Sequence, residues 1–406
     1  VLFAESSTTL TLTDDTDLAQ FDAGDNIYAA SDPPASFAPV LYSGNGGTQS
    51  ITTGMAPDLV WIKNRSVTDS HVLFDTIRGV EQVLYSNLTT NDSYNPGSLT
   101  SFDSNGFTLG SYANANAAGS DFVAWCWSAG GTTVTNNDGT IPSQVRSNGD
   151  FSVITYAGNI TAGANFGHGL NSQPQMVILK RYDSGGSDSS WTVQHVGIGL
   201  GSGRVFLNKT DANGTGGSTA YWNDTAPDSS VVTLGSNPDV NNGSMLAYCW
   251  ANSPTQSFGS YTGNGTGTGP TIECGFEATC VIFKRTDIAG YAWWIIDNQR
   301  GENAVLYPNL SNAEAAGSDI VEFTPTGFKI VTSATEVNGS GGTYIYAAFS
   351  SAGGPTGVIG DITGLDMTLS ESTGTWEVGQ TVTMDPKAVN ATTGYLSFDS
   401  GTGNVE

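Results

Sequence analysis

The chain contains one sequence unit written three times, and this repetition limits its architecture more than any single residue does. Each copy opens on Tyr-x-Gly-Asn, at Tyr42, Tyr156 and Tyr261, and closes on an apolar, aromatic-rich strand. The openings lie 114 and 105 residues apart. Solenoid and propeller repeats span about 20–50 residues, whereas a spacing near 100 residues is typical of a complete small domain. The spacing therefore predicts three homologous domains in tandem.

The repeats divide the chain into five parts. Repeat 1 is expected at residues 35–132, repeat 2 at 133–254 and repeat 3 at 255–354, with residues 130–149 as a linker. Smaller segments flank them at residues 1–34 and 355–406. These two resemble each other, since both alternate apolar and polar residues as half-buried hairpin strands do. We interpret them as small β-modules, the second continuing into further sequence.

Apolar runs of five to seven residues, bounded by Gly, Asn, Asp and Pro, are the signature of β-strands. In repeat 1 they predict strands at 39–43, 49–52, 59–63, 71–76, 82–86, 107–111 and 122–127. Seven or eight short strands in about 100 residues favour an antiparallel sandwich, because one sheet alone leaves a face uncovered. The predicted fold is all-β, with three jelly-roll or lectin-like sandwiches.

Charge excludes some partners. The chain has 13 basic and 38 acidic residues, a formal net charge of −25. Such a surface repels the phosphates of nucleic acids and the anionic lipids of membranes. No apolar run reaches the 18 residues of a spanning helix, and no signal peptide is visible. We therefore expect no nucleic-acid binding and no membrane insertion.

The four cysteines are too few for a disulfide scaffold. Cys126 and Cys249 occupy equivalent positions, and Ala348 replaces them in repeat 3, which predicts a small buried apolar side chain. Cys274 and Cys280 could meet across a turn, but two buried thiols are the favoured interpretation.

No catalytic motif is present, and we expect no enzyme activity. The three histidines, His71, His168 and His195, do not recur at matched positions. Scattered carboxylates leave a glycosidase as a minor alternative. The segment from Asn237 to Gly243 is acidic like a calcium loop, but its glycine stands one position late, so an Asx-rich turn is favoured. No cofactor is expected, and calcium is only a weak alternative.

The basic residues recur, which makes them the candidates for ligand binding. They are Lys63, Arg65, Lys180, Arg181, Lys284 and Arg285 at the ends of equivalent strands, with Arg78 and Arg300 after the next strand. One interpretation is a cation in each domain that binds an acidic polysaccharide. The favoured alternative is structural, with each Lys paired to Asp75 or Asp297. Repeat 2 weakens both, because Gly199 stands where Arg78 and Gly79 would be.

Several phrases resemble a known family. They are PDLVWIKNR (57–65), SFDSNGF (101–107), AWCW (124–127), WNDTAP (222–227) and VLYPNLSNAE (305–314). Together they are similar to the tandem repeats of large virion proteins from marine tailed bacteriophages, which are described as tail-fibre, adhesin-like or structural proteins. The resemblance covers residues 37 to 354 and carries over no catalytic residue. Its link to lectins rests on fold-level analogy.

The resemblance implies a virion fibre or appendage protein whose sandwiches attach to a host-surface glycan or protein. The alternatives are a purely structural head fibre, capsid decoration or extracellular filament, and, less favoured, a polysaccharide depolymerase. The expected location is the virion exterior, or otherwise the cell surface. The expected partners are other virion proteins and further copies of the chain, a homotrimer by default. Any recognition site is expected in loops where the three copies differ.

Overall fold

The computed structural model describes residues 36–183, 189–214, 217–317 and 319–351 in full, and the backbone of six strands outside them. These strands are β1 (Thr9–Thr11), β2 (Asn26–Ala29), β30 (Thr356–Thr363), β31 (Asp366–Ser372), β32 (Thr381–Asp385) and β33 (Tyr395–Ser397). The chain divides into two compact units. One contains residues 1–35, 275–277 and 352–406, and the other contains residues 36–274 and 278–351.

The first unit holds strands from both ends of the chain. They form one antiparallel six-stranded sheet in the order β1-β31-β30-β2-β32-β33, so that β2 lies between β30 and β32. The two flanking segments, expected as separate β-modules, therefore pair with each other. The other residues of these two segments lie outside the described residues.

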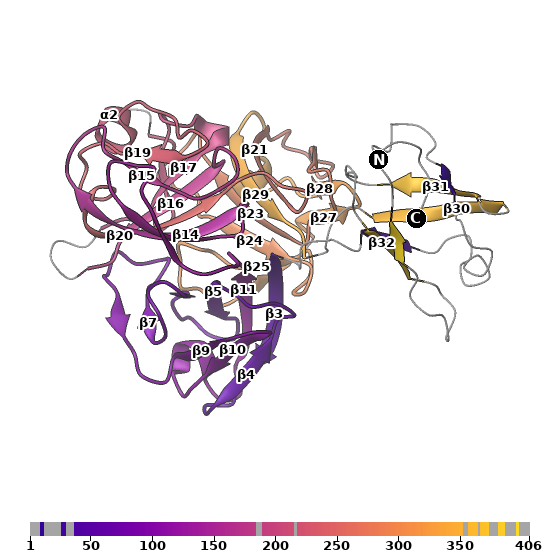
Figure 1. Ribbon diagram of the computed structural model, residues 1–406, viewed down its shortest axis with the longest axis horizontal. Helices are drawn as coiled ribbons and strands as arrows, with labels where there is room; N and C mark the ends of the chain where they lie inside the picture. Colours follow the sequence, from indigo (N-terminus) through magenta and orange to yellow (C-terminus); the bar gives the residue numbers. More distant parts are fainter. Residues whose placement is uncertain are drawn as a thin grey trace. The chain divides into compact units, whose positions relative to one another are not determined.

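Repeat 1 forms two main sheets, ordered β3-β11-β5-β6 and β4-β10-β9, with a small β7-β8 hairpin (Figure 1). Its elements are β3 (Phe37–Ser43), β4 (Gln49–Thr52), β5 (Leu59–Asn64), β6 (Val72–Asp75), β7 (Gln82–Val83), β8 (Ser93–Tyr94), β9 (Leu99–Asp103), β10 (Gly106–Leu109), α1 (Ala113–Asn116) and β11 (Asp121–Trp127). All pairings within it are antiparallel. Seven strands were predicted here, and the short β8 and β9 were missed.

Repeat 3 copies this arrangement, with sheets ordered β21-β29-β23-β24 and β22-β28-β27 and a small β25-β26 pair. Its elements are β21 (Gln256–Thr262), β22 (Thr271–Glu273), β23 (Cys280–Arg285), β24 (Trp294–Asp297), β25 (Ala304–Val305), β26 (Ala315–Ala316), β27 (Val321–Thr324), β28 (Gly327–Ile330), α3 (Thr335–Asn338) and β29 (Thr343–Phe349).

Repeat 2 enlarges the same plan to a seven-stranded sheet, β12-β13-β14-β20-β16-β17-β18, and a β15-β19 pair. Its elements are β12 (Val134–Asn136), β13 (Ser143–Ser147), β14 (Phe151–Asn159), β15 (Asn165–Gly167), β16 (Met176–Arg181), β17 (Thr192–His195), η2 (Val196–Ile198), β18 (Val205–Phe206), α2 (Ser218–Trp222), β19 (Val231–Thr233) and β20 (Asn242–Trp250). The expected linker at 130–149 thus supplies two strands, β12 and β13.

Two recurrent hydrogen bonds explain why Tyr-x-Gly-Asn opens each copy. The hydroxyl of Tyr42 donates to the carbonyl of Ala115 at 2.7 Å, and the amide oxygen of buried Asn116 accepts from the backbone N–H of Asn45. Both bonds recur in the other repeats, through Tyr156, Asn159 and Asn241 and through Tyr261, Asn264 and Asn338. A buried amide needs such partners, so the phrase recurs for a structural reason.

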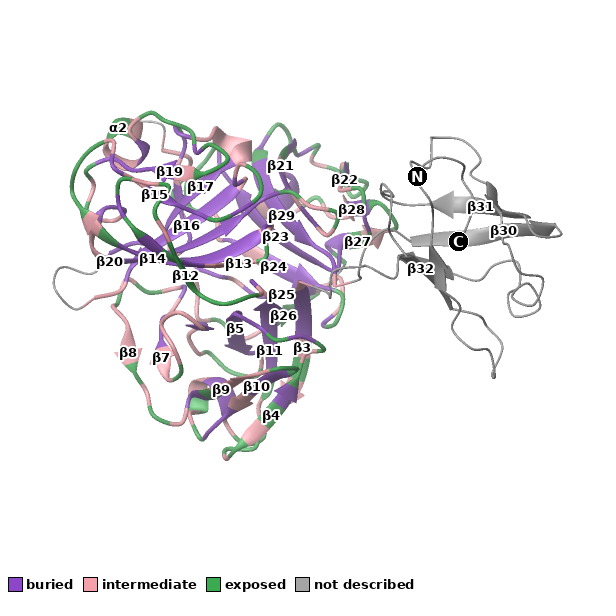
Figure 2. Ribbon diagram, in the orientation of Figure 1, coloured by how far each residue is buried: buried purple, intermediate pink, exposed green. Residues whose placement is uncertain are grey.

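Alternate residues of each central strand enter different cores. In repeat 1, Val60 and Cys126 lie in a core confined to that repeat. Their neighbours Trp61 and Trp125 point to the opposite face and enter a second core. Cys249 in repeat 2 occupies the place of Cys126, which confirms the prediction that these cysteines are small buried residues. Figure 2 shows the central strands buried, as expected for strands covered on both faces.

The second core is shared by all three repeats. Trp127, Trp250 and Phe349 each end the closing strand of one repeat, and their ring centroids lie 5.3–6.5 Å apart in all three pairings. Each repeat thus contributes one sheet face to a closed, pseudo-threefold arrangement. The all-β antiparallel prediction is confirmed. Three tandem domains were predicted; in the structure the three repeats belong to one compact unit, and the inner face of each sheet is covered by the other two repeats.

Among the described residues, no helix is long and apolar enough to cross a membrane. All four cysteines are free thiols, including Cys274 and Cys280. Burial raises the pKa of the Cys274 thiol to about 12, so it is protonated at neutral pH.

Candidate functional site

Three seams join the repeats: the 1–2 seam, the 2–3 seam and the 3–1 seam. Each contains one equivalent backbone hydrogen bond from a loop of one repeat to a strand end of the next. The donors and acceptors are Asp92 to Tyr182 (2.9 Å), Asn213 to Thr286 (2.8 Å) and Glu314 to Arg65 (2.9 Å). Because these bonds use the main chain, they are preserved while the side chains around them change. They close the three repeats into a ring.

A side chain before β6, β17 and β24 adds a second contact to each seam. The indole N–H of Trp191 donates to the carbonyl of Tyr85, and that of Trp293 donates to the carbonyl of Phe206, both at 2.9 Å. His71 stands at the equivalent position in repeat 1. Its ring lies against the backbone of Tyr307 outside ordinary hydrogen-bond geometry, so this third contact is looser.

The three recurrent lysines lie near the ends of their strands, on the sheet face that is turned to the shared core. All three are buried. Lys180 donates to the carbonyl of Thr89 across the 1–2 seam at 2.7 Å and to that of Ser189. Lys63 donates to the carbonyls of Asn64 and Val67. Burial lowers the pKa of Lys63 to about 8, against the opposite effect of nearby carboxylates. The expected Lys–Asp75 pairing was wrong, because backbone carbonyls hold these ammonium groups.

Lys284 repeats this arrangement in repeat 3. Its ammonium group donates to the carbonyl of Arg285, and burial lowers its pKa to about 8, with Asp211 and Asp287 opposing the shift. The side chain is 1% exposed, so a ligand cannot reach the charge without unfolding the strand end.

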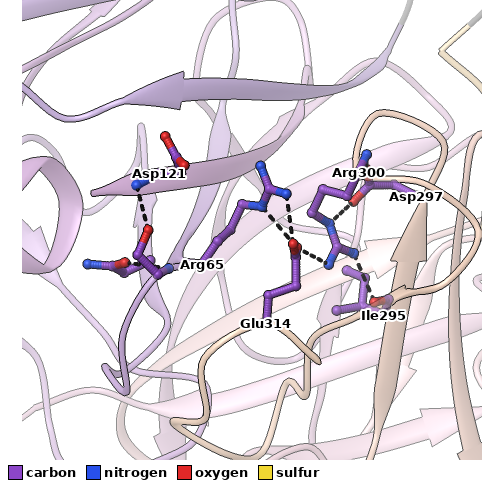
Figure 3. Close-up of polar contacts among 8 residues, drawn as sticks. Arg65, Asp121, Ile295, Asp297, Arg300 and Glu314 are labelled. Carbon is purple, nitrogen blue, oxygen red and sulfur yellow. Dashed lines mark hydrogen bonds and ion pairs between the residues drawn. The ribbon is translucent and has the colours of Figure 1, made fainter. Parts of the chain in front are cut away.

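Asp297 and Asp75 pair with arginines instead. At the 3–1 seam, Arg300 Nε lies 2.6 Å from Asp297 Oδ2, and both side chains are fully buried. Arg300 also reaches Glu314 at 3.2 Å, and Glu314 binds Arg65 of repeat 1 at 2.7 Å (Figure 3). The carbonyl of Ile295 accepts another N–H of Arg300. The network fixes repeat 3 against repeat 1.

The 1–2 seam has a matching set. Asp75 binds Arg78 at 2.6 Å, and Arg78 binds Asp92 at 3.0 Å. A donor from the neighbouring repeat completes each carboxylate: the Tyr248 hydroxyl reaches Asp75, and the Trp125 indole reaches Asp297, both at 2.9 Å. The charges are therefore satisfied internally.

The 2–3 seam lacks the aspartate, the arginine and the side-chain donor that the other two seams contain. Ala347 stands where the other repeats carry the donor, and His195 stands where they carry the aspartate. Ile198 takes the place of the arginine. His195 Nε2 instead faces the carbonyl of Tyr346 at 3.0 Å. Loss of donor, acceptor and cation in one seam leaves no buried charge unpaired.

Arg181 and Arg285, the last two candidates, form local ion pairs. Arg181 binds Asp183 at 2.7 Å and Arg285 binds Asp287 at 2.9 Å, each across a turn that follows the strand. Arg285 also lies over the ring of Tyr291, 4.7 Å from its centroid. None of the eight candidate basic residues converges with another around an open cleft in the part of the chain that the structure describes.

The histidines share one hydrogen-bond pattern. Nδ1 accepts an N–H in each, from Trp61 at His71, from Gly197 at His195 and from Leu170 at His168. Burial lowers the pKa of all three, that of His195 to about 4. The neutral ring is therefore the folded form. Within the described ranges, no three His, Cys, Asp or Glu side chains gather as a metal site.

The shared core contains a small apolar cavity of about 10 Å³. Residues of all three repeats line it, among them Trp61, Trp250, Trp293 and Phe349. That volume is about the space of one water molecule. The cavity marks imperfect packing on the pseudo-threefold axis and is too small for an organic ligand.

Sequence reasoning missed a set of aromatic pairs in which Phe206 is buried and the other members are partly buried. They are Tyr85 with Tyr112, Phe206 with Tyr221, and Tyr307 with Trp294. One pair occurs in each repeat, next to a seam. The first members lie at or just after the end of the segment that pairs with β6, β17 or β24, and this shared position was the available signal.

The fold and its internal charges define a closed module of three β-repeats in which recurrent polar residues are structural. The profile of a domain family of unknown function, DUF7483, matches residues 32–352, and the chain belongs to this family. The match spans all three repeats as one unit, in agreement with the shared core. No curated protein matches the chain. No solved structure matches it either.

Proposed function

We propose that the chain is a non-enzymatic fibre or appendage protein on the exterior of a phage virion, and that it attaches to the host surface. The shared three-repeat core carries this proposal. It makes a rigid module whose recurrent charges are used internally, which leaves the loops to vary. The likeness of the repeat phrases to those of marine phage virion proteins supports the same function.

The path of the chain gives this module two different ends. Phe37 in the first strand and Phe349 in the last lie together, with centroids 5.2 Å apart, so the chain enters and leaves at one end of the axis. The lysines lie at the other ends of the central strands. The hairpin loops there expose Val67 and Ile288 at equivalent positions, 47% and 49% exposed. A loop face away from the connections suits a displayed surface.

Immunogold electron microscopy tests the location. Antibodies raised against the full chain are expected to label an external appendage of particles purified from a culture that expresses it. Label only on cells or in the soluble fraction would overturn the virion proposal. The homotrimer stays a prediction, which sedimentation of the full chain measures. The shared core is already filled by three repeats of one chain, so a trimer would form through other surfaces.

A purely structural filament is the second candidate, and the closed core favours it because a rigid spacer needs no binding site. Adsorption to host cells separates the two. Purified protein that binds the cells and competes with the virus supports attachment. Protein that shows neither, although it labels the particle, supports the structural alternative.

A further inference from the structure

The three repeats treat the outer strand of their main sheet differently. In repeat 2 the strand β14 pairs with β13, which runs antiparallel to it. In repeat 3 the segment before β21 covers the start of that strand, because Ser253 and Gln256 exchange two backbone hydrogen bonds. In repeat 1 the equivalent strand β3 pairs with β11 on one side, and no strand lies on its other side among the described residues (Figure 1).

The pairing with β11 determines which backbone groups of β3 face outward. The N–H of Gly44, just after β3, donates to the carbonyl of Ser120 at 2.8 Å in the same register. Residues of an antiparallel strand bond alternately to one side and the other, so the even-numbered residues of β3 bond to β11. Pro39, Leu41 and Ser43 therefore direct their main-chain polar groups away from the sheet. Proline is tolerated in a sheet at such an outward position.

These outward groups differ in what they still offer. Proline has no N–H, so Pro39 offers only its carbonyl. The carbonyl of Ser43 already accepts from the side chain of Gln49 at 3.1 Å. In the part of the chain that the structure describes, no group bonds to the N–H or the C=O of Leu41. The open edge thus presents the N–H groups of Leu41 and Ser43 and the carbonyls of Pro39 and Leu41.

The side chain at the centre of this edge is apolar in repeat 1 only. Leu41 is 37% exposed. The residues that precede the matching tyrosines in repeats 2 and 3 are polar, Thr155 and Ser260. Edge strands of soluble proteins commonly carry charges that prevent pairing with another chain, whereas β3 contains no charged residue. The edge that is open is therefore also the edge with an exposed leucine.

The donors and acceptors of β3 are complementary to those of a second β3. Two antiparallel copies related by a two-fold axis at Leu41 match the N–H of each Leu41 to the C=O of the other. In the same register the N–H of Ser43 meets the carbonyl of Pro39. The N–H that Pro39 lacks falls opposite the Ser43 carbonyl, which Gln49 already satisfies.

Other registers fit less well. A shift of two residues in one direction places Pro39 opposite Leu41, whose carbonyl then lacks a donor. A shift in the other direction places Leu41 opposite Ser43, whose carbonyl is already bonded. The arrangement of polar groups on this edge therefore selects a second copy of the same strand, in one register.

We propose that β3 is a self-association edge, at which residues 39–43 of two copies pair antiparallel and join their sheets across a two-fold axis. The two Leu41 Cα atoms lie about 5.5 Å apart in such a pair, so each leucine removes the other from water. One patch in contact with itself makes closed dimers rather than open filaments.

The dimer is expected to be weak in dilute solution, because the contact is small and each chain carries a net charge of −25. Salt screens this repulsion and strengthens the dimer. Copies held close together on a particle pair more readily, since their effective concentration is high. The inference goes beyond the proposed function, because it concerns how copies of the chain join and not where they are displayed.

Sedimentation of the full chain over a range of concentrations, at low and high salt, measures the association. Leu41→Lys places two like charges opposite each other and is expected to raise the dissociation constant at least about tenfold. Leu41→Thr, which installs the residue of repeat 2, is expected to raise it roughly 3–10-fold. Ser260→Lys is the matched control, because Ser260 is the exposed residue at the same position of β21. Circular dichroism and thermal melting check that each variant folds.

Two further measurements report on the geometry of the pair. Hydrogen exchange of the unmodified chain is expected to slow at the Leu41 and Ser43 N–H groups as protein concentration rises, a readout that needs no variant. Leu41→Cys, oxidised with copper phenanthroline in air, is expected to give a disulfide-linked dimer, since the Cα separation lies in the disulfide range. Ser260→Cys and the unmodified chain, with its four free thiols, are the controls.

Three outcomes overturn the inference: a monomer at every concentration and salt, association that Leu41→Lys and Ser260→Lys weaken equally, or association that leaves exchange at Leu41 unchanged. A trimer with unchanged Leu41 exchange removes the pairing and supports the homotrimer expected of a fibre. Virion labelling without dimers retains the proposed function and removes the pairing. Dimers with protected Leu41 and no virion labelling retain the pairing and remove the virion proposal.

Discussion

The 3–1 seam and the 2–3 seam join equivalent strands with opposite chemistry. The first contains the buried Arg300–Asp297 pair and the bridging Glu314. The second has His195 and Ala347 at the corresponding positions, and no ion pair crosses it among the described residues. Both retain the same backbone bond between repeats. The difference shows that main-chain geometry and shape close the ring, whereas each seam balances its own charges.

The largest expected effect comes from breaking the ionic seam. Asp297→Ala leaves Arg300 without its nearest carboxylate and Trp125 without an acceptor. Loss of one partner of a buried pair costs about 3–5 kcal/mol. We expect guanidinium unfolding to show a loss of this size. His195→Ala at the equivalent position is the control, with an expected loss of about 1–3 kcal/mol for unpaired backbone groups.

Removing the charge of Arg300 as well tests whether the unpaired cation causes this loss of stability. The double variant Asp297→Ala, Arg300→Met eliminates the unpaired cation, and most of the lost stability is expected to return. Equal losses for Asp297→Ala and His195→Ala, with no recovery in the double variant, would show that the buried ions of the 3–1 seam contribute no more to stability than the neutral contacts of the 2–3 seam.

The next largest loss of stability is expected from removing the indole hydrogen bonds. Trp191→Phe and Trp293→Phe keep a ring in place but leave the carbonyls of Tyr85 and Phe206 without a donor. An unsatisfied buried acceptor costs about 1–3 kcal/mol, to which the smaller ring adds some lost packing. Thermal melting is expected to show similar losses for both variants. A loss confined to one would mean that the two seams are less alike than their geometry indicates.

The neutral seam should respond to acid through His195. Its folded pKa is about 4, below the ordinary value of 6.5, because burial disfavours the charged ring. The unfolded chain therefore binds a proton first as pH falls, and the stability contributed by the neutral ring is lost between pH 6.5 and about 4.

His195→Gln keeps a donor and an acceptor but cannot titrate in this range. Its melting temperature is expected to fall less than that of the unmodified protein between pH 7 and pH 4.5. Parallel curves would place the acid sensitivity elsewhere, with His71 as the next group to replace.

The smallest effect is expected at the exposed edge of the ionic seam. Arg65→Ala removes a pair with Glu314 whose side chains are 21% and 15% exposed. Pairs that reach solvent contribute about 1 kcal/mol or less and weaken with salt. Unfolding at low and high ionic strength is expected to show a small difference that shrinks with salt. A difference independent of salt would indicate lost packing of the Arg65 stem.

Much of the local structure was predictable from sequence. The strands around Trp61 and Trp125 were recognised from apolar runs, and Cys126 was recognised as buried from its replacement by Ala348. Strand β9 was missed because Leu99–Asp103 has one strongly apolar end and otherwise reads as loop. The linker strands β12 and β13 were missed for the same reason, since Val134–Asn136 is polar and exposed.

The seams were not predictable. Nothing near Asp297 in the sequence indicates that Trp125, 172 residues away, donates to it. The recurrent lysines suggested carboxylate partners, but the ends of their strands provide backbone carbonyls at closer range. The aromatic pairs were not predicted for a related reason. Tyr112, Tyr221 and Trp294 come from different segments of their repeats, so a comparison of the copies position by position does not align them.

The sequence by itself determined the repeat, the antiparallel strands and the alternation of side chains along them, because these follow from composition and from the two-residue period of a strand. Tertiary structure alone decided that one face of all three central sheets meets in a common core. That outcome depends on how side chains from three different repeats fit together, as Trp127, Trp250 and Phe349 do. Local sequence patterns do not indicate which distant side chains will pack together.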